Sequence, residues 1–89
     1  MDLRIVVLQR RWHLVGVYTR EGLYARLSHC SVIRRWGTTD GLGELAEKGP
    51  LASTELDAVP RGVEYFEPTA VFTLHCNVEA WAEYLESAP

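Results

Sequence analysis

Short apolar runs and alternating apolar and polar positions dominate this chain, and both patterns are typical of β-strands. Residues 3–9, "LRIVVLQ", form a near-continuous apolar run rich in β-branched side chains, which predicts a strand covered on both faces. Residues 12–20, "WHLVGVYTR", predict a second strand. The intervening "QRRW" leaves room only for a hairpin, and Gly22 in "REG" supplies the next turn.

The next predicted strand contains a break in its alternation. Leu23, Ala25 and Leu27 fall on one face, but the next inward candidates are Cys30 and Val32. One residue is therefore inserted around "SHC", which predicts a β-bulge or a short corner that bends the strand before it resumes as "SVIRRW".

The segment "DGLGELAEKG" predicts a short helix over residues 40–48. Asp40 is a good N-cap residue, and Gly49 followed by Pro50 is a typical C-terminal stop. The apolar stripe of this helix consists of Leu42, Leu45 and Ala46.

Three further strands and a second helix are expected after Pro50. "ASTELD" and "GVEYF" predict edge strands joined by the turn "AVPRG", and "AVFTLHC" predicts a strand with clean alternation. Its expected inward residues are Ala70, Phe72, Leu74 and Cys76. A C-terminal helix over residues 78–86 is expected, capped by Asn77. Its expected packing stripe is Val78, Trp81, Ala82 and Leu85.

Together these elements predict a mostly β (α+β) fold. The chain of 89 residues is expected to form a single domain, residues 1–89, because a chain of this size buries enough surface for a single core of modest stability. A strongly bent antiparallel sheet or small barrel of about six strands satisfies the pattern, with the C-terminal helix closing one opening. No apolar run is long enough for a membrane span, and the start lacks a signal-peptide cleavage site. A cytoplasmic protein with two reduced thiols is expected.

The net charge of −3 hides an asymmetry along the chain. Residues 1–36 hold seven arginines against two carboxylates, a net of +5, whereas residues 37–89 hold two basic residues against ten carboxylates, a net of −8. The two halves either pair across the fold or create a dipolar surface that steers a charged partner.

Residues 34–43, "RRWGTTDGLG", are the first candidate site. An arginine, two threonine hydroxyls, glycine N–H groups and a helix N-terminus can converge on an anion. The candidate partner- or anion-binding residues are Arg34, Arg35, Thr38, Thr39, Gly41 and Gly43. The segment matches neither the P-loop nor the dinucleotide-binding glycine pattern, and Asp40 lies where an anion would bind.

The alternative for this segment is a structured turn. Gly37 and Gly41 would then adopt unusual backbone dihedrals, Gly43 would permit close packing against the sheet, and Trp36 would fill the core. Alternation also implies that Arg34 and Arg35 point to opposite faces.

A secondary surface is expected at the first hairpin, where Arg10, Arg11 and Trp12 cluster. These side chains suit contacts to a nucleic-acid backbone or to the rim of a protein partner. On an acidic protein, salt bridges to the acidic half explain the arginines equally well.

The two "HC" dipeptides, which contain Cys30 and Cys76, suggest zinc or thiol chemistry. Neighbouring strand residues project to opposite faces, so one dipeptide cannot easily supply two ligands to an ion, although paired strands could place the two cysteines together. Buried, inert thiols are the simpler interpretation, and no metal, cofactor or catalytic residue is expected.

The segment "VIRRWGTTDGLGELAEKGP", followed by "TELD" and "VFTLHC", resembles a group of small uncharacterised proteins of bacteriophage and prophage genomes. The resemblance extends from Leu3 to Trp81 and is most specific in "IRRWGTTDGLGELA". It implies a mobile-element protein that acts in the cytoplasm of a bacterial host.

These observations favour a non-enzymatic phage or prophage protein that binds a host protein complex and inhibits an antiviral defence system, as anti-CRISPR proteins do. The alternative is a module that sequesters a nucleotide or phosphate compound through the 34–43 segment. A third hypothesis is a hydrolase that uses Cys30 or Cys76. Exposed sheet edges also suggest a homodimer.

Overall fold

The computed structural model describes residues 1–88 and contains six strands and two helices. The strands are β1 (Leu3–Leu8), β2 (Trp12–Glu21), β3 (Tyr24–Arg35), β4 (Glu55–Val59), β5 (Val63–Phe66) and β6 (Ala70–His75). The helices are α1 (Leu42–Lys48) and α2 (Ala82–Ser87), and two short 3₁₀ turns are η1 (Gln9–Arg11) and η2 (Glu67–Thr69).

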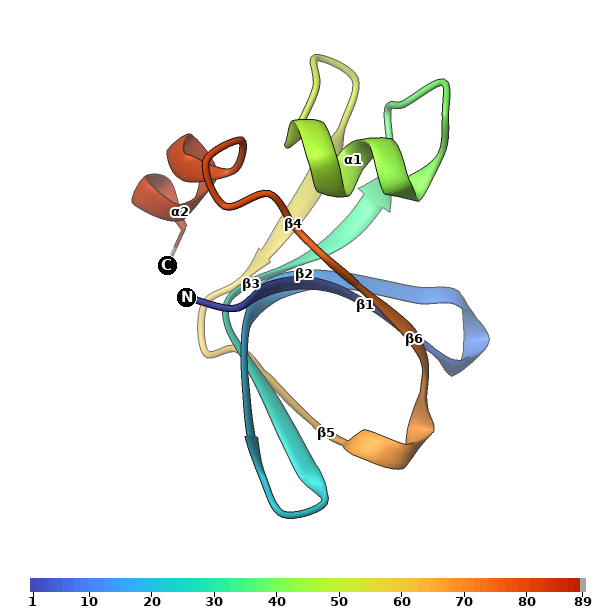
Figure 1. Ribbon diagram of the computed structural model, residues 1–89, viewed down its shortest axis with the longest axis vertical. Helices are drawn as coiled ribbons and strands as arrows, with labels where there is room; N and C mark the ends of the chain where they lie inside the picture. The colour runs from blue at the N-terminus through green and yellow to red at the C-terminus, as the bar shows by residue number, and fades with distance from the viewer. Residues whose placement is uncertain (89) are drawn as a thin grey trace.

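The six strands form one antiparallel sheet in the order β4-β3-β2-β1-β6, with β5 paired to β3 beside β4. The sheet is strongly bent but not closed, which confirms the expected fold class and favours the bent sheet over the barrel. Figure 1 shows both helices above the sheet, with β5 and η2 curling beneath it.

The bend is concentrated in β3. Its first part pairs with β5 and its last part with β4, so one strand serves two neighbours in succession. Opposite β2, the register passes from Val17↔Ser28 to Val15↔Ser31, which leaves His29 and Cys30 facing a single residue, Gly16. This is the expected β-bulge at "SHC", and His29 adopts a left-handed backbone with φ of 49°.

Gly16 makes this bulge possible. A Cβ atom at Gly16 would lie 2.9 Å from the carbonyl oxygen of Ser28 and 3.0 Å from Cβ of Leu27. Two backbones can approach this closely only where one residue has no side chain. The corner of the sheet therefore depends on a glycine within β2.

The strand β1 is buried on both faces, as its continuous apolar run predicted. One core lies between the sheet and the helices and consists of Leu3, Ile5, Val7, Val15, Ile33, Leu42, Leu45, Ala46 and Trp81. The other lies inside the curl and consists of Val6, Leu14, Ala25, Leu27, Cys30 and Tyr65. Successive buried residues of β1 enter opposite cores, so both faces of the strand need apolar side chains, while Arg4 and Leu8 are only half-buried.

The C-terminal segment is fastened to the rest of the fold by two aromatic residues. Trp81 is fully buried, and its indole N–H donates to the carbonyl of Ala46 in α1 at 3.2 Å. The Tyr84 hydroxyl donates to the carbonyl of His29 at 2.8 Å and lies 2.8 Å from the Ser31 hydroxyl. The helix α2 thus braces the bulge on which the bend depends.

Both helices begin later than expected. The first begins at Leu42 behind Gly41, so the expected start at 40 and the expected Asp40 N-cap are wrong. The second begins at Ala82 behind Trp81, so the expected start at 78 and the expected Asn77 N-cap are wrong. The carbonyl of Asn77 instead accepts N–H groups from Ala80 and Trp81 in turns that precede the helix.

Several expected core residues lie on the surface. Phe72 is 49% exposed and Trp36 is 38% exposed, and Leu23 and Ala82 are also exposed. Phe72 lies on β6, the strand at one margin of the sheet. A Cβ atom at Gly43 would meet no other atom within 4 Å, so the expected close packing of this glycine against the sheet is wrong.

The two glycines give a matched test of the corner. Gly16→Ala should destabilise the protein by about 1–3 kcal/mol, because the new methyl group would displace the Ser28 backbone. Gly43→Ala should stabilise it by about 0.5–1 kcal/mol, because alanine is the better helix former and has open space there. Urea unfolding measures both. Equal effects of the two substitutions would contradict this explanation of the corner.

Candidate functional site

The two arginines of the 34–43 segment lie at the end of β3 beside the marginal strand β4. Nη1 of Arg34 lies 2.7 Å from Oδ2 of Asp57, and Nη1 of Arg35 lies 3.3 Å from Oε2 of Glu55. The arginine side chains are 66% and 67% exposed, because a register shift after Ile33 brings both to the surface. Strand alternation implied that the two arginines point to opposite faces, but both are exposed.

These ion pairs join the basic and acidic halves of the chain. Each is solvent-exposed and contributes little stability, typically under about 1 kcal/mol. Their consequence is electrostatic: the charges of Arg34 and Arg35 are largely balanced by Asp57 and Glu55. The interpretation that the two halves pair across the fold fits these contacts.

The loop between β3 and α1 satisfies its own polar groups. The Thr38 hydroxyl donates to the carbonyl of Gly41 at 2.7 Å. The backbone N–H groups of Thr39 and Asp40 donate to Oε1 of Glu44 at 3.0 and 2.9 Å. The carboxylate of Glu44 thus occupies the position expected for a bound anion.

The charge of Glu44 is stabilised by these donors. Its pKa lies below the ordinary value, chiefly because the N–H of Asp40 donates to it, with further help from Lys48 and the N–H of Thr39. Lys48 Nζ lies 3.3 Å from its other oxygen. Gly37 and Gly41 have φ of 70° and 85°, as the structured-turn alternative expected.

The tip of the β1–β2 hairpin has an unusual backbone. Arg10 and Arg11 adopt left-handed conformations with φ of 64° and 65°. This conformation costs about 1–2 kcal/mol for a residue with a side chain, whereas glycine adopts it freely. Both arginines are exposed, and the neighbouring Trp12 is 54% exposed.

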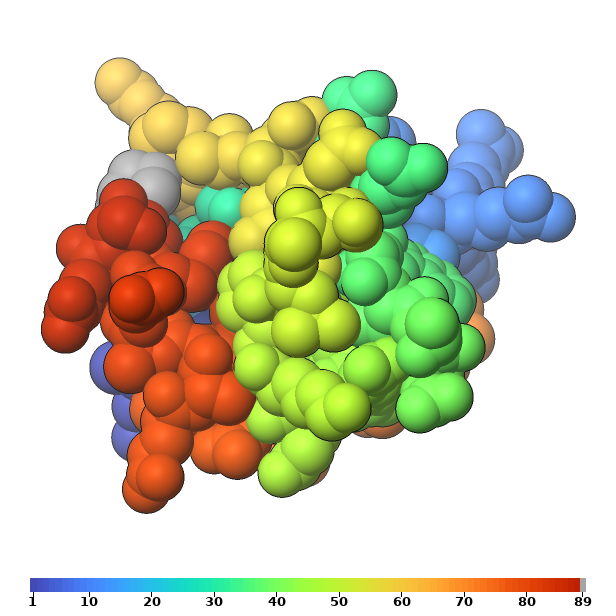
Figure 2. Space-filling model, turned by 90° about the horizontal axis from the view of Figure 1, so that it is seen from above, coloured from blue at the N-terminus to red at the C-terminus, as the bar shows by residue number. Residues whose placement is uncertain are grey.

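The hairpin arginines also differ from those of β3 in their charge environment. In residues 1–88, no carboxylate lies within ion-pair distance of Arg10 or Arg11. Their positive charges are therefore available to a partner. Figure 2 shows the blue hairpin projecting from one end of the molecule beside the green segment that follows β3.

An aromatic contact joins the β1–β2 hairpin to the segment that follows β3. The rings of His13 and Trp36 meet edge to face, with centroids 5.4 Å apart. The ring of His13 is held in turn by the carbonyl of Arg11, 2.8 Å from Nδ1. We call the surface formed by Arg10, Arg11, Trp12, His13 and Trp36 the arginine–tryptophan surface.

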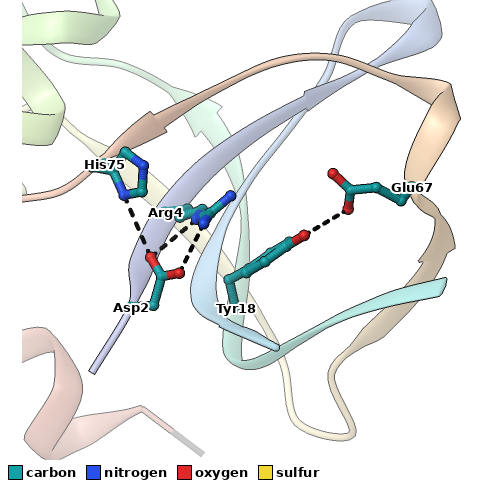
Figure 3. A network of polar contacts seen from close by, with 5 residues as sticks. All are labelled: Asp2, Arg4, Tyr18, Glu67 and His75. Carbon is teal, nitrogen blue, oxygen red and sulfur yellow. Dashed lines mark hydrogen bonds and ion pairs between the residues drawn. The ribbon is translucent and has the colours of Figure 1, made fainter. Parts of the chain in front are cut away.

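A polar cluster at the opening of the curl was not predicted from the sequence (Figure 3). Arg4 donates to both carboxylate oxygens of Asp2 at 3.0 and 2.9 Å, and its guanidinium lies 3.8 Å from the ring centroid of Tyr18. The Tyr18 hydroxyl donates to Glu67 at 2.9 Å, and His75 lies 3.4 Å from Asp2. The cluster ties β1, β2, β6 and η2 together where the sheet is open.

The signal for this cluster was weak in the sequence. Arg4 interrupts the apolar run of β1, but its partners are separated from it along the chain, up to His75. The hydrogen bonds from Arg4 hold the pKa of the Asp2 carboxyl below its usual range, and burial raises the pKa of Tyr18. Paired in this way, these groups stabilise the fold.

The two cysteines lie apart. Cys30 is buried in the core inside the curl, whereas Cys76, directly after β6, packs against the core under the helices; β3 and β6 do not pair. Burial raises the pKa of Cys30 to about 11 and that of Cys76 to about 12, so both thiols are protonated at neutral pH and are weak nucleophiles. In the described part of the chain, no three His, Cys, Asp or Glu side chains are grouped to hold a metal ion.

Comparisons with known proteins give no family assignment. No family model, curated protein or solved structure matches this chain. Within residues 1–88, neither helix has the length and apolar character needed to cross a membrane.

Glu44 offers a test of the loop. Because its pKa is lowered in the folded state, its ionised form stabilises the protein at neutral pH, and this contribution is lost as pH falls through that lowered pKa. Glu44→Gln should therefore be less stable than the wild type at pH 7, and the two should converge in acid. Urea unfolding across this range measures the difference, and Glu86→Gln on the exposed face of α2 is the control. If the difference in stability between Glu44→Gln and the wild type did not change with pH, the ionised carboxylate of Glu44 would not be what stabilises the loop.

Proposed function

We propose that this chain is a non-enzymatic binding protein of phage or prophage origin that acts in the cytoplasm of a bacterial host. In this proposal it binds a host protein complex stoichiometrically and inhibits an antiviral defence system, the role played by anti-CRISPR proteins. The observation that carries the proposal is the hairpin tip, where two strained arginines with no carboxylate partner among residues 1–88 lie beside an exposed tryptophan.

The residue types at this tip are those that dominate protein–protein binding. Tryptophan and arginine are enriched among the residues that lose most binding energy when truncated. Arg10 and Arg11 have no internal carboxylate partner in residues 1–88, whereas Arg34 and Arg35 have Asp57 and Glu55. We therefore place the hairpin at the centre of the binding surface and the 34–43 segment, through Trp36, at its rim.

The strained backbone supports the same conclusion. Glycine would adopt the left-handed conformation of Arg10 and Arg11 at lower cost, so the backbone here does not favour arginine, and the side chains suit a role outside the fold. The hairpin is held by β1 and β2, which are buried in both cores. A rigid loop loses little conformational entropy when it binds, which favours affinity.

The expected partner presents carboxylates around an apolar recess. The carboxylates would pair with the two arginines, and the recess would receive the indole of Trp12. Steering by the exposed positive charge would speed association at low salt. The protein's net charge of −3 disfavours nucleic acid as the partner.

The nucleotide-sequestering alternative has less support. A phosphate in the 34–43 loop would have to displace Glu44 from the N–H groups of Thr39 and Asp40. It would also compete with the carboxylates that balance Arg34 and Arg35.

Charge reversal at the hairpin tests the proposed surface. Arg10→Glu/Arg11→Glu and Trp12→Ala should each reduce partner recovery from bacterial lysate at least tenfold, because they remove the free charges or the aromatic anchor. Arg61→Glu, on the exposed turn between β4 and β5, is a control that should bind as the wild type does. Arg34→Gln/Arg35→Gln should have a smaller effect, because these side chains are already paired.

Arg10→Gly/Arg11→Gly separates binding from folding. This variant should bind poorly yet unfold at the same or a higher urea concentration, because glycine relieves the left-handed strain. A partner retained equally by the wild type and all hairpin variants would refute the arginine–tryptophan surface.

A thermal-shift panel tests the alternative. If the loop sequesters a nucleotide, mono-, di- or cyclic nucleotides should raise the melting temperature, since a ligand at about 100 times its Kd adds about 2.7 kcal/mol. We expect no shift with any of these compounds. A shift that is lost in Thr39→Pro, which lacks one loop N–H, would instead favour the nucleotide-binding module.

A further inference from the structure

The bent sheet leaves three marginal strands, and they differ in charge. The strand β4 carries Glu55 and Asp57, and β5 carries Glu64. Charged side chains on a sheet edge discourage pairing with another chain. By contrast, β6 (Ala70–His75) contains no Asp, Glu, Lys or Arg.

Among residues 1–88, β6 pairs only with β1, so the backbone groups on its outer edge have no strand partner. The N–H of Cys76 donates to the carbonyl of Leu3 at 2.9 Å, and antiparallel ladders alternate between residues that bond inward and outward. The N–H and C=O groups of Phe72 and Leu74 therefore point toward β1. Those of Val71, Thr73 and His75 point away from it.

The side chains of β6 also leave apolar surface exposed. Val71 is 60% exposed and Phe72 is 49% exposed, on opposite faces of the strand. An uncharged strand with a free edge and exposed apolar side chains is a template for strand addition.

We propose that β6 pairs with β6 of a second copy of this chain, antiparallel and about a two-fold axis at Thr73. In this register, Val71 lies opposite the partner's His75, Phe72 lies opposite the partner's Leu74, and all three outward-pointing residues form hydrogen bonds. The exposed Phe72 is then covered by an apolar side chain, and two sheets join into one.

The charge distribution favours a second copy as the occupant of this edge. In a two-fold symmetric interface, the same surface of both copies is in contact. A two-fold pairing at β4 would therefore bring the carboxylates of Glu55 and Asp57 in one copy close to those of the other copy. The uncharged β6 carries no such repulsion.

The antiparallel arrangement also separates the two hairpin tips. The start of β6 lies beside Leu8, next to the hairpin, whereas its end lies beside Arg4. The arginine pairs of the two copies therefore lie at opposite ends of the joined strands. The dimer does not rest on the proposed function, although it would present two binding surfaces to a multivalent partner.

Thr73→Pro tests the pairing through the backbone. Proline removes the outward N–H of Thr73 but no bond to β1, so the variant should fold and sediment as a monomer. Thr73→Val keeps that N–H and should remain dimeric. Sedimentation equilibrium should give twice 10.1 kDa for the wild type and for Thr73→Val.

Phe72→Lys provides a second route to the same result. It introduces like charges near the axis without altering the backbone, and it should also give a monomer even if proline disturbs the strand. Circular dichroism and urea unfolding establish that each variant is folded. A wild type that is monomeric at its highest soluble concentration, or a dimer that persists in both Thr73→Pro and Phe72→Lys, would overturn the proposal.

Discussion

The close crossing of β2 and β3 at Gly16 is the constraint on which the rest of this structure depends. A side chain at Gly16 would collide with the backbone of Ser28, so the two strands could not turn together at the bulge. Because they do turn, the first part of β3 pairs with β5 and the last part with β4. The bent sheet then has one core on each face. One core lies between the sheet and the helices, and the other lies inside the curl, where the sheet itself encloses it without a further layer of helices.

The same corner explains why the short C-terminal helix is attached where it is. A helix of six residues has little stability of its own, so its place is decided by tertiary contacts. Trp81 fills the core beside α1, and the Tyr84 hydroxyl bonds to the carbonyl of His29, whose left-handed backbone forms the bulge. A strained residue is thus held by a partner from the other end of the chain.

The distribution of charge makes the surface of the molecule asymmetric. Carboxylates from the acidic half balance Arg34 and Arg35, and Glu44 satisfies the loop that resembled an anion site. The hairpin arginines remain unbalanced within residues 1–88 and lie beside two exposed tryptophans, Trp12 and Trp36. Internal pairing therefore leaves the hairpin as a place where positive charge is free to attract a partner.

The sequence by itself determined the mostly β fold, the strands, the bulge at "SHC" and the burial of β1 on both faces, because periodicity and glycine placement are local signals. Tertiary structure decided the strand order, the exposure of Trp36 and Phe72, the late start of both helices and the cluster around Arg4. It also decided that Arg34 and Arg35 form ion pairs, whereas Arg10 and Arg11 have no carboxylate partner within residues 1–88. An alternating pattern shows that a strand has two faces, but it does not show which neighbour covers each face. A charge in the sequence likewise does not show which opposite charge the folded chain places within 4 Å of it.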